Sequence, residues 1–125
     1  MKELLLIGIG GGIGSIFRFL LSKALQSIAP FAFPVGTLFV NVSGSFLIGF
    51  LSLLMFNRFA IYSFEFRALI LIGLLGGFTT FSTFSLEAID LWESGERAKM
   101  IIYLLTSLVL GLCATYGGII LGRKL

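Results

Sequence analysis

Charged residues and metal-ligating side chains are both scarce in this chain of 125 residues. Lys, Arg, Asp and Glu make up 12% of the sequence, about half the fraction of an ordinary soluble domain. There is no histidine and one cysteine, Cys113, which excludes a disulfide within the chain and removes the usual ligands of zinc or haem. The basic residues are scattered and the net charge is only +3, which argues against a nucleic-acid-binding surface.

Apolar residues, by contrast, are abundant: 58% of the sequence is hydrophobic and the mean hydropathy is +1.09. A helix that crosses a bilayer needs about 20 apolar residues. Four stretches meet this requirement, at about 4–26, 34–56, 67–91 and 100–121. Short loops join them, the first marked by Pro30 and Pro34, and they leave no room for a soluble domain. We therefore expect an all-α integral membrane protein with one four-helix domain over residues 1–125.

The first stretch is rich in glycine, and two interpretations taken from other protein classes do not fit it. A cleaved signal peptide is disfavoured by Glu3 near its start and by the glycines, so we expect the stretch to be retained. A dinucleotide-binding fingerprint fails because the third glycine is missing in both possible registers. In a membrane helix, Gly8 with Gly12 and Gly10 with Gly14 predict faces for close helix packing.

The basic residues are almost evenly divided between the two sides of the predicted membrane domain. One side carries five, namely Lys2, Arg58, Arg67, Arg123 and Lys124. The other side carries four, namely Arg18, Lys23, Arg97 and Lys99. So small a bias leaves two alternatives open: a single orientation, or insertion in both orientations, which would permit an antiparallel homodimer.

Polar side chains recur at intervals of four residues on one face of the second and fourth stretches. They are Thr37, Asn41 and Ser45 in the second, and Tyr103, Ser107, Gly111 and Thr115 in the fourth. For Asn41 the alternatives are a helix-to-helix hydrogen bond and a pore-lining donor. The absence of carboxylates, lysines and histidines from these faces favours a path for a small anion or a neutral solute over a proton relay.

The third stretch contains "GGFTTFSTFS" at residues 76–85, where small and hydroxyl-bearing residues interrupt an apolar segment. Gly76 and Gly77 together weaken a helix by about 2 kcal/mol relative to alanine. We therefore predict a break at mid-membrane, whose freed backbone groups can bind an ion or line a cavity. Phe81 and Phe84 share one helical face, and their alternatives are packing or ring edges that stabilise an anion.

Three strings carry a resemblance that spans nearly the whole chain. They are "GGIGSIFRF" in the first stretch, "GTLFVNVSGSFLIGF" in the second and "GGFTTFSTFSLEA" in the third. With these strings the sequence resembles the Fluc fluoride channel family, also called CrcB. The resemblance implies an antiparallel, dual-topology homodimer with two pores, passive export of fluoride from the cytoplasm, fluoride resistance, and a place in a bacterial inner or plasma membrane. It implies no enzymatic activity, no nucleotide and no nucleic acid.

The resemblance also implies roles for individual residues. The pore residues would be Thr37, Asn41, Phe81, Ser82, Thr83, Phe84, Glu87, Tyr103, Ser107 and Thr115. Arg18 would stand in the vestibule, although an arginine near the end of a span can also snorkel. A structural sodium ion at the dimer interface would be held by the backbone carbonyls of Gly76 and Thr79. One departure is Gly111, where some members of the family carry serine, so the hydroxyl stripe of the fourth stretch has a gap there.

Two rival interpretations remain to be tested. A small multidrug-resistance-type transporter needs a membrane-embedded glutamate in its first helix, and this chain has only Glu3 at the very start. A non-transporting assembly subunit would need neither Asn41 nor the two hydroxyl-bearing faces. A fluoride-leak assay separates these two interpretations and the fluoride channel.

Overall fold

The structure is a computed structural model that describes residues 1–29, 32–57 and 63–125. Pro30 and Arg58, which the sequence places in loops, lie outside these described residues. Four helical segments are long and apolar enough to cross a membrane: Lys2–Ile28, Val35–Asn57, Phe64–Glu93 and Arg97–Lys124. The prediction of an all-α protein with four helices suited to the membrane is confirmed.

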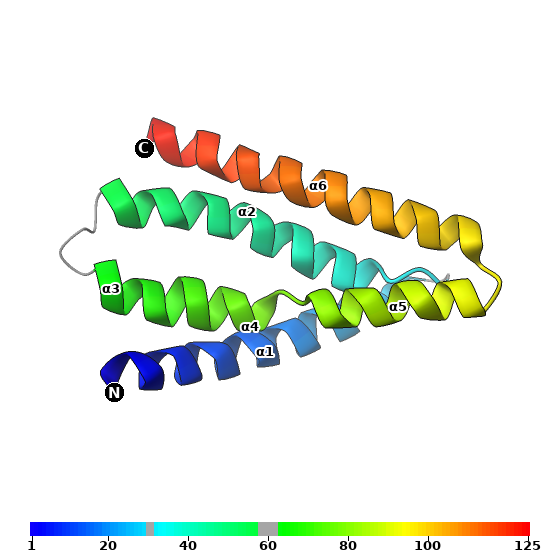
Figure 1. Cartoon of the computed structure of the whole chain (residues 1–125), viewed down its shortest axis with the longest axis horizontal. Coiled ribbons are helices and arrows are strands. Elements are labelled where there is room, and N and C mark those ends of the chain that lie inside the picture. Colours follow the sequence, from blue (N-terminus) through cyan, green and yellow to red (C-terminus); the bar gives the residue numbers. More distant parts are fainter. Residues whose placement is uncertain (30–31, 58–62) are drawn as a thin grey trace.

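Three of these segments are continuous helices: α1 (Lys2–Ile28), α2 (Val35–Asn57) and α6 (Arg97–Lys124). An uninterrupted helix satisfies its backbone hydrogen bonds within itself, which is what the hydrocarbon core of a bilayer demands. Figure 1 shows α2 and α6 side by side, running in the same direction, and these two helices share the most extensive contact in the chain.

The third segment is different, because it is assembled from four pieces. They are α3 (Ser63–Phe66), the π-helical η2 (Arg67–Leu75), α4 (Gly76–Phe78) and α5 (Phe81–Glu93). Between α4 and α5 the backbone is extended, with φ −84° and ψ 157° at Thr79 and φ −151° and ψ 123° at Thr80. This interruption, visible in Figure 1, falls near the centre of the 30-residue segment Phe64–Glu93.

Glycine allows α1 to approach the third segment closely. A Cβ added at Gly10 or Gly14 would collide with backbone carbonyl oxygens of η2. At Gly8 and Gly12, nothing in the described chain lies within 4 Å of an added Cβ. Of the two packing faces that the sequence predicts on α1, only the one formed by Gly10 and Gly14 packs inside the single chain.

Buried side chains are few, and the largest that are fully enclosed are Val40, Leu75 and Tyr103. Large apolar side chains elsewhere face outward: Leu5 is 65% exposed and Phe19 63% exposed. In water, so much exposed apolar surface would be costly, but lipid or another protein surface solvates it without penalty. The packing of the single chain is therefore that of a multi-pass membrane protein.

Candidate functional site

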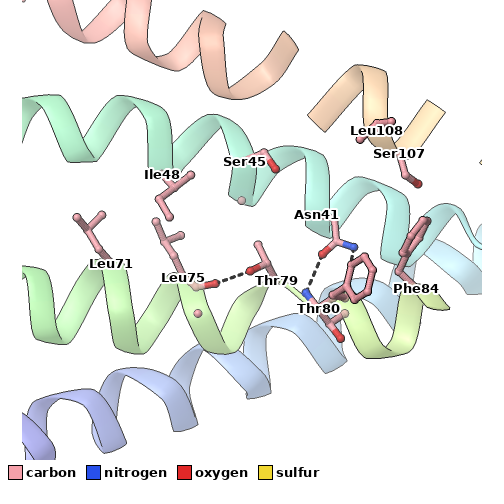
Figure 2. Close-up of a pocket in the computed structure, with 13 residues that line it drawn as sticks. Asn41, Ser45, Ile48, Leu71, Leu75, Thr79, Thr80, Phe84, Ser107 and Leu108 are labelled. Carbon is pink, nitrogen blue, oxygen red and sulfur yellow. Dashed lines mark hydrogen bonds between the residues drawn. The ribbon is translucent and has the colours of Figure 1, made fainter. Parts of the chain in front are cut away.

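Asn41 on α2 binds both backbone polar groups of one residue, Thr80, at the interruption of the third segment. Its Nδ2 donates to the carbonyl oxygen of Thr80 at 2.9 Å, and its Oδ1 accepts from the Thr80 backbone N–H at 2.8 Å (Figure 2). Of the two alternatives for Asn41, the helix-to-helix hydrogen bond is therefore present. A side-chain amide carries two N–H groups, and the second one has no partner among the described residues.

The hydroxyl of Thr80 starts α5 by accepting a hydrogen bond from the backbone N–H of Thr83 at 3.2 Å. This is the ordinary N-cap arrangement, which satisfies one of the donors left free at a helix start. The Thr80 side chain is 9% exposed. With its backbone N–H and C=O bonded to Asn41 and its hydroxyl bonded to the N–H of Thr83, Thr80 is held by both its backbone and its side chain.

Gly76 and Thr79, the predicted cation-binding pair, flank the last turn before the interruption. The N–H and hydroxyl of Thr79 both donate to the carbonyl oxygen of Leu75, at 3.0 and 2.9 Å. In the described chain, no hydrogen bond outside the helices reaches the carbonyl oxygen of Gly76 or Thr79. Gly76 is exposed, whereas a Cβ at Gly77 would collide with the backbone of α1. Free carbonyls at an unwound helix suit a sodium ion.

One cavity, of roughly 590 Å³, opens beside the interruption between α2, α6 and the third segment; we call it the uncharged cavity. It is lined by Asn41, Gly44, Ser45, Ile48, Leu71, Leu75, Gly76, Thr79, Thr80, Phe81, Phe84, Ser107 and Leu108. Figure 2 shows most of these side chains around it. None of these lining residues carries a charged side chain, so its polar character comes from amide, hydroxyl and backbone groups.

Phe81 and Phe84 both line the uncharged cavity, but their surroundings differ. Their ring centroids lie 5.7 Å apart. Phe84 also packs against the ring of Tyr103, at 5.0 Å between centroids. Phe81 is 80% exposed in the single chain. Phe84 therefore belongs partly to the core, while Phe81 makes little contact within its own chain.

A second cavity, of roughly 660 Å³, also has Thr80 in its lining; we call it the charged cavity. It is lined by Ser15, Arg18, Phe19, Ser22, Lys23, Gln26, Ser27, Thr37, Thr80, Thr83 and Glu87. The structure thus brings the predicted vestibule residue Arg18 together with Thr37, Thr83 and Glu87. Since Thr80 lines both cavities, it stands at the boundary between them.

The carboxylate of Glu87 is held by two hydroxyl donors from other helices. Thr37 donates to its Oε1 at 2.7 Å, and the Tyr103 hydroxyl donates to its Oε2 at 2.9 Å. Tyr103 is fully buried and lines neither cavity. The predicted pore residue Tyr103 therefore acts, within the single chain, as a support for Glu87 and Phe84.

Two further predicted pore residues also lie away from both cavities. The hydroxyl of Thr115 donates to the carbonyl oxygen of Gly111 at 3.1 Å, within α6. Ser82 is exposed, and its hydroxyl lies 3.4 Å from that of Thr80. Conversely, both cavities have lining residues that were absent from the predicted set, and Thr80 and Ser45 are two of them. The only sequence signal for Thr80 is its place in the interrupted stretch after Gly76 and Gly77, and the signal for Ser45 is its spacing of four residues from Asn41.

These features define the class of protein: a multi-pass helical membrane protein with polar cavities inside its helix bundle. Residues 5–119 match the family described as CrcB-like protein, Camphor Resistance (CrcB). The chain belongs to this family, as its resemblance to the Fluc (CrcB) channels predicts.

Three similar proteins each carry the name fluoride-specific ion channel FluC. The one from Methylococcus capsulatus is 49% identical over 98% of this chain, which spans 54% of that protein's length. The one from Aquifex aeolicus is 48% identical over 95% of each chain. The one from Rhizobium meliloti is 44% identical over 100% of this chain and 99% of the other.

Proposed function

We propose that this protein is a fluoride-selective channel through which fluoride leaves the cytoplasm passively. Its family membership, and the names of its relatives, support fluoride as the ion. The structural observation that carries the proposal is the uncharged cavity, which offers hydroxyl and amide donors without a charged group that would trap an anion. Conduction of this kind needs no catalytic step, and export through a bacterial inner or plasma membrane would confer fluoride resistance.

The two cavities suggest successive stages of one path. In the charged cavity the two cations Arg18 and Lys23 outnumber the one carboxylate, Glu87, and the resulting positive potential would raise the local concentration of anions. Beyond Thr80, the anion would exchange water for hydroxyl and amide donors and for the positive edges of the Phe81 and Phe84 rings. A ring edge stabilises an anion more weakly than a fixed cation does, so the ion can also leave.

We infer further that two copies assemble as an antiparallel homodimer with two pores. The nearly equal division of basic residues supports insertion in both orientations. Gly76 and Phe81 are exposed in the single chain, beside the interruption, and a partner subunit would cover them. The free carbonyls of Gly76 and Thr79 from both subunits would hold a structural sodium ion, which would fasten the interruption.

The channel function is tested with purified protein in liposomes loaded with potassium fluoride or potassium chloride. After addition of a potassium ionophore, ion-selective electrodes record the efflux of each anion. We expect rapid fluoride efflux and no chloride efflux above that of protein-free liposomes. Equal rates for the two anions, or no fluoride efflux, would contradict the proposal, and the latter result would favour an assembly subunit.

The antiparallel dimer is tested by labelling a single cysteine. Cys113 is exposed, so it is first replaced by serine, and a cysteine is then introduced in place of Lys124. In cells, a membrane-impermeant maleimide should label about half of the Lys124→Cys chains from outside, and the rest only after permeabilisation. Labelling from one side alone would exclude the antiparallel arrangement, and with it the shared sodium site.

A further inference from the structure

Hydroxyl side chains in membrane helices usually donate to the carbonyl oxygen three or four residues earlier. Ser43, Ser52, Ser85, Thr106 and Thr115 all do so here. Among the serine and threonine side chains that the structure describes, four hydroxyls have no hydrogen-bond partner, and all four belong to residues that line a polar cavity. They are Ser45 and Ser107 in the uncharged cavity, and Ser22 and Thr83 in the charged cavity. The Oγ of Ser107 is also buried, so solvent does not replace the missing hydrogen-bond partner.

Ser45 on α2 stands opposite the gap that Gly111 leaves in the hydroxyl stripe of α6. A Cβ built on Gly111 would find the Oγ of Ser45 at 3.7 Å and no other atom of the described chain within 4 Å outside its own helix. The next turn of both helices shows the same alignment of α2 with α6. There, Gly49 of α2 packs against the backbone of Thr115 of α6. Since α2 and α6 run in the same direction (Figure 1), Asn41 lies at the level of Ser107 and Ser45 at the level of Gly111.

We propose that Ser45 is an anion-binding residue of the uncharged cavity, and that its hydroxyl supplies from α2 the donor that α6 lacks at Gly111. This inference rests on the proposed channel function. A small anion that has shed part of its water needs several donors at once, and a free hydroxyl is one that can turn toward it. The Ser107 hydroxyl and the second N–H of Asn41 lie within about one helical turn of Ser45, a rise of about 6 Å for four residues.

The arrangement in Figure 2 agrees with this role. Asn41 and Ser45 come from α2 and Ser107 comes from α6, and all three belong to the lining of the same cavity. A serine that only filled space between helices would be expected to bond its own backbone, as Ser43 does with the carbonyl oxygen of Val40 at 3.1 Å. Ser43 and Ser45 are therefore a matched pair on one helix, one with its hydroxyl occupied and one with its hydroxyl free.

The test compares fluoride efflux from liposomes carrying the parent protein, Ser45→Ala or Ser43→Ala. We expect Ser45→Ala to conduct roughly tenfold more slowly, because an ion in the cavity loses one donor, and Ser43→Ala to conduct within about twofold of the parent. Size-exclusion chromatography checks that both variants keep the parent's assembly state. Equal rates for Ser45→Ala and the parent, or equal losses in both variants, would overturn the proposal.

A double variant, Ser45→Gly with Gly111→Ser, moves the hydroxyl from α2 to α6 without removing it from the cavity. The space beside Gly111 accepts a Cβ, since its nearest neighbour is the Ser45 hydroxyl that the variant deletes. We expect Ser45→Gly alone to be as slow as Ser45→Ala, and the double variant to recover to within about twofold of the parent. Failure of the second substitution to restore efflux would assign the loss to packing and reject the binding role.

The parent protein separates failure of this inference from failure of the proposed function. If the parent carries no fluoride, the channel function is wrong and the role of Ser45 falls with it. If the parent carries fluoride and Ser45→Ala does so at the same rate, the channel function stands and only the role of Ser45 is wrong.

Discussion

The two polar cavities meet at Thr80 but differ in how they can attract an anion. The charged cavity has two cations, Arg18 and Lys23, against one carboxylate, Glu87, and the potential of these charges acts over several ångströms. The uncharged cavity has only short-range donors and ring edges, which act on an ion in contact with them. On the proposed function, the comparison teaches that concentrating an anion and dehydrating it are separate tasks, which fall to separate groups of residues. If so, substitutions in the two cavities will fail in different ways.

The largest expected effect comes from Asn41→Asp, in the uncharged cavity beside Thr80. Aspartate keeps an acceptor for the Thr80 N–H but loses the donor to the Thr80 carbonyl oxygen, and it adds an acceptor to an anion path. We expect fluoride efflux to fall roughly a hundredfold, which corresponds to about 3 kcal/mol and matches an unsatisfied buried polar group. Asn57→Asp, at the exposed end of the same helix, is the control and should conduct normally. A normal rate for Asn41→Asp would show that neither role of Asn41 matters.

Replacement of either cavity phenylalanine by isoleucine should slow fluoride efflux by roughly tenfold, because the volume is nearly kept while the polar ring edge is lost. Phe84→Ile should also lower thermal stability, since Phe84 packs on Tyr103, whereas Phe81→Ile should not alter the stability of the isolated fold. Phe39→Ile, at a half-exposed ring on α2, is the control for loss of an aromatic group. If Phe81→Ile and Phe84→Ile both conduct like the parent, their rings have only a packing role.

In the charged cavity, Arg18→Gln should produce a smaller effect that depends on salt. We expect fluoride efflux to fall roughly threefold at low ionic strength, and the difference to shrink toward zero near 1 M salt, where the Debye length is about 3 Å. Lys99→Gln is the control, because Lys99 pairs with Glu96 at 3.3 Å and lines neither cavity. If fluoride efflux stayed equally slow at high salt, Arg18 would contact the ion directly. The proposed difference between long-range attraction in the charged cavity and direct contact in the uncharged cavity would then be wrong.

The smallest effect is expected for Thr115→Val. The Thr115 hydroxyl bonds a carbonyl oxygen of its own helix and reaches neither cavity in the single chain, so its loss should change fluoride efflux by less than about twofold. Its counterpart is Ser107→Ala, which removes a free hydroxyl from the uncharged cavity and should be clearly slower. A strong defect in Thr115→Val would extend the uncharged cavity along α6, as the family resemblance implies.

The number and character of the helices were predictable from the sequence, because apolar length and glycine-rich faces are local properties. The family was predictable as well, since the string around Gly76–Ser85 is specific. The hydrogen-bond partner of Asn41 could not be predicted from the sequence. Its amide bonds with Thr80, which lies 39 residues away along the chain, and the periodicity of one helix does not identify a partner on another. The same limit applies to Ser45, because the role proposed for it depends on Gly111, a residue of another helix.

Gly8 and Gly12 illustrate a different limit. Their spacing is the same as that of Gly10 and Gly14, yet only the latter pair contacts η2 within the chain. Spacing identifies a face that can pack closely, but it does not identify what packs there. The identity of the occupant depends on the rotation of α1 about its axis, which is set by contacts along its whole length.

The hydrogen bonds between Asn41 and the backbone of Thr80 have a consequence for biosynthesis. The second span leaves the ribosome before the third, so the amide that satisfies Thr80 is already present when the third span arrives. Without it, the third span would insert most favourably as one unbroken helix, since lipid offers no partner for a free peptide group. Chain order thus lets the earlier span act as a template, and the later span can adopt its interrupted shape as it enters the bilayer.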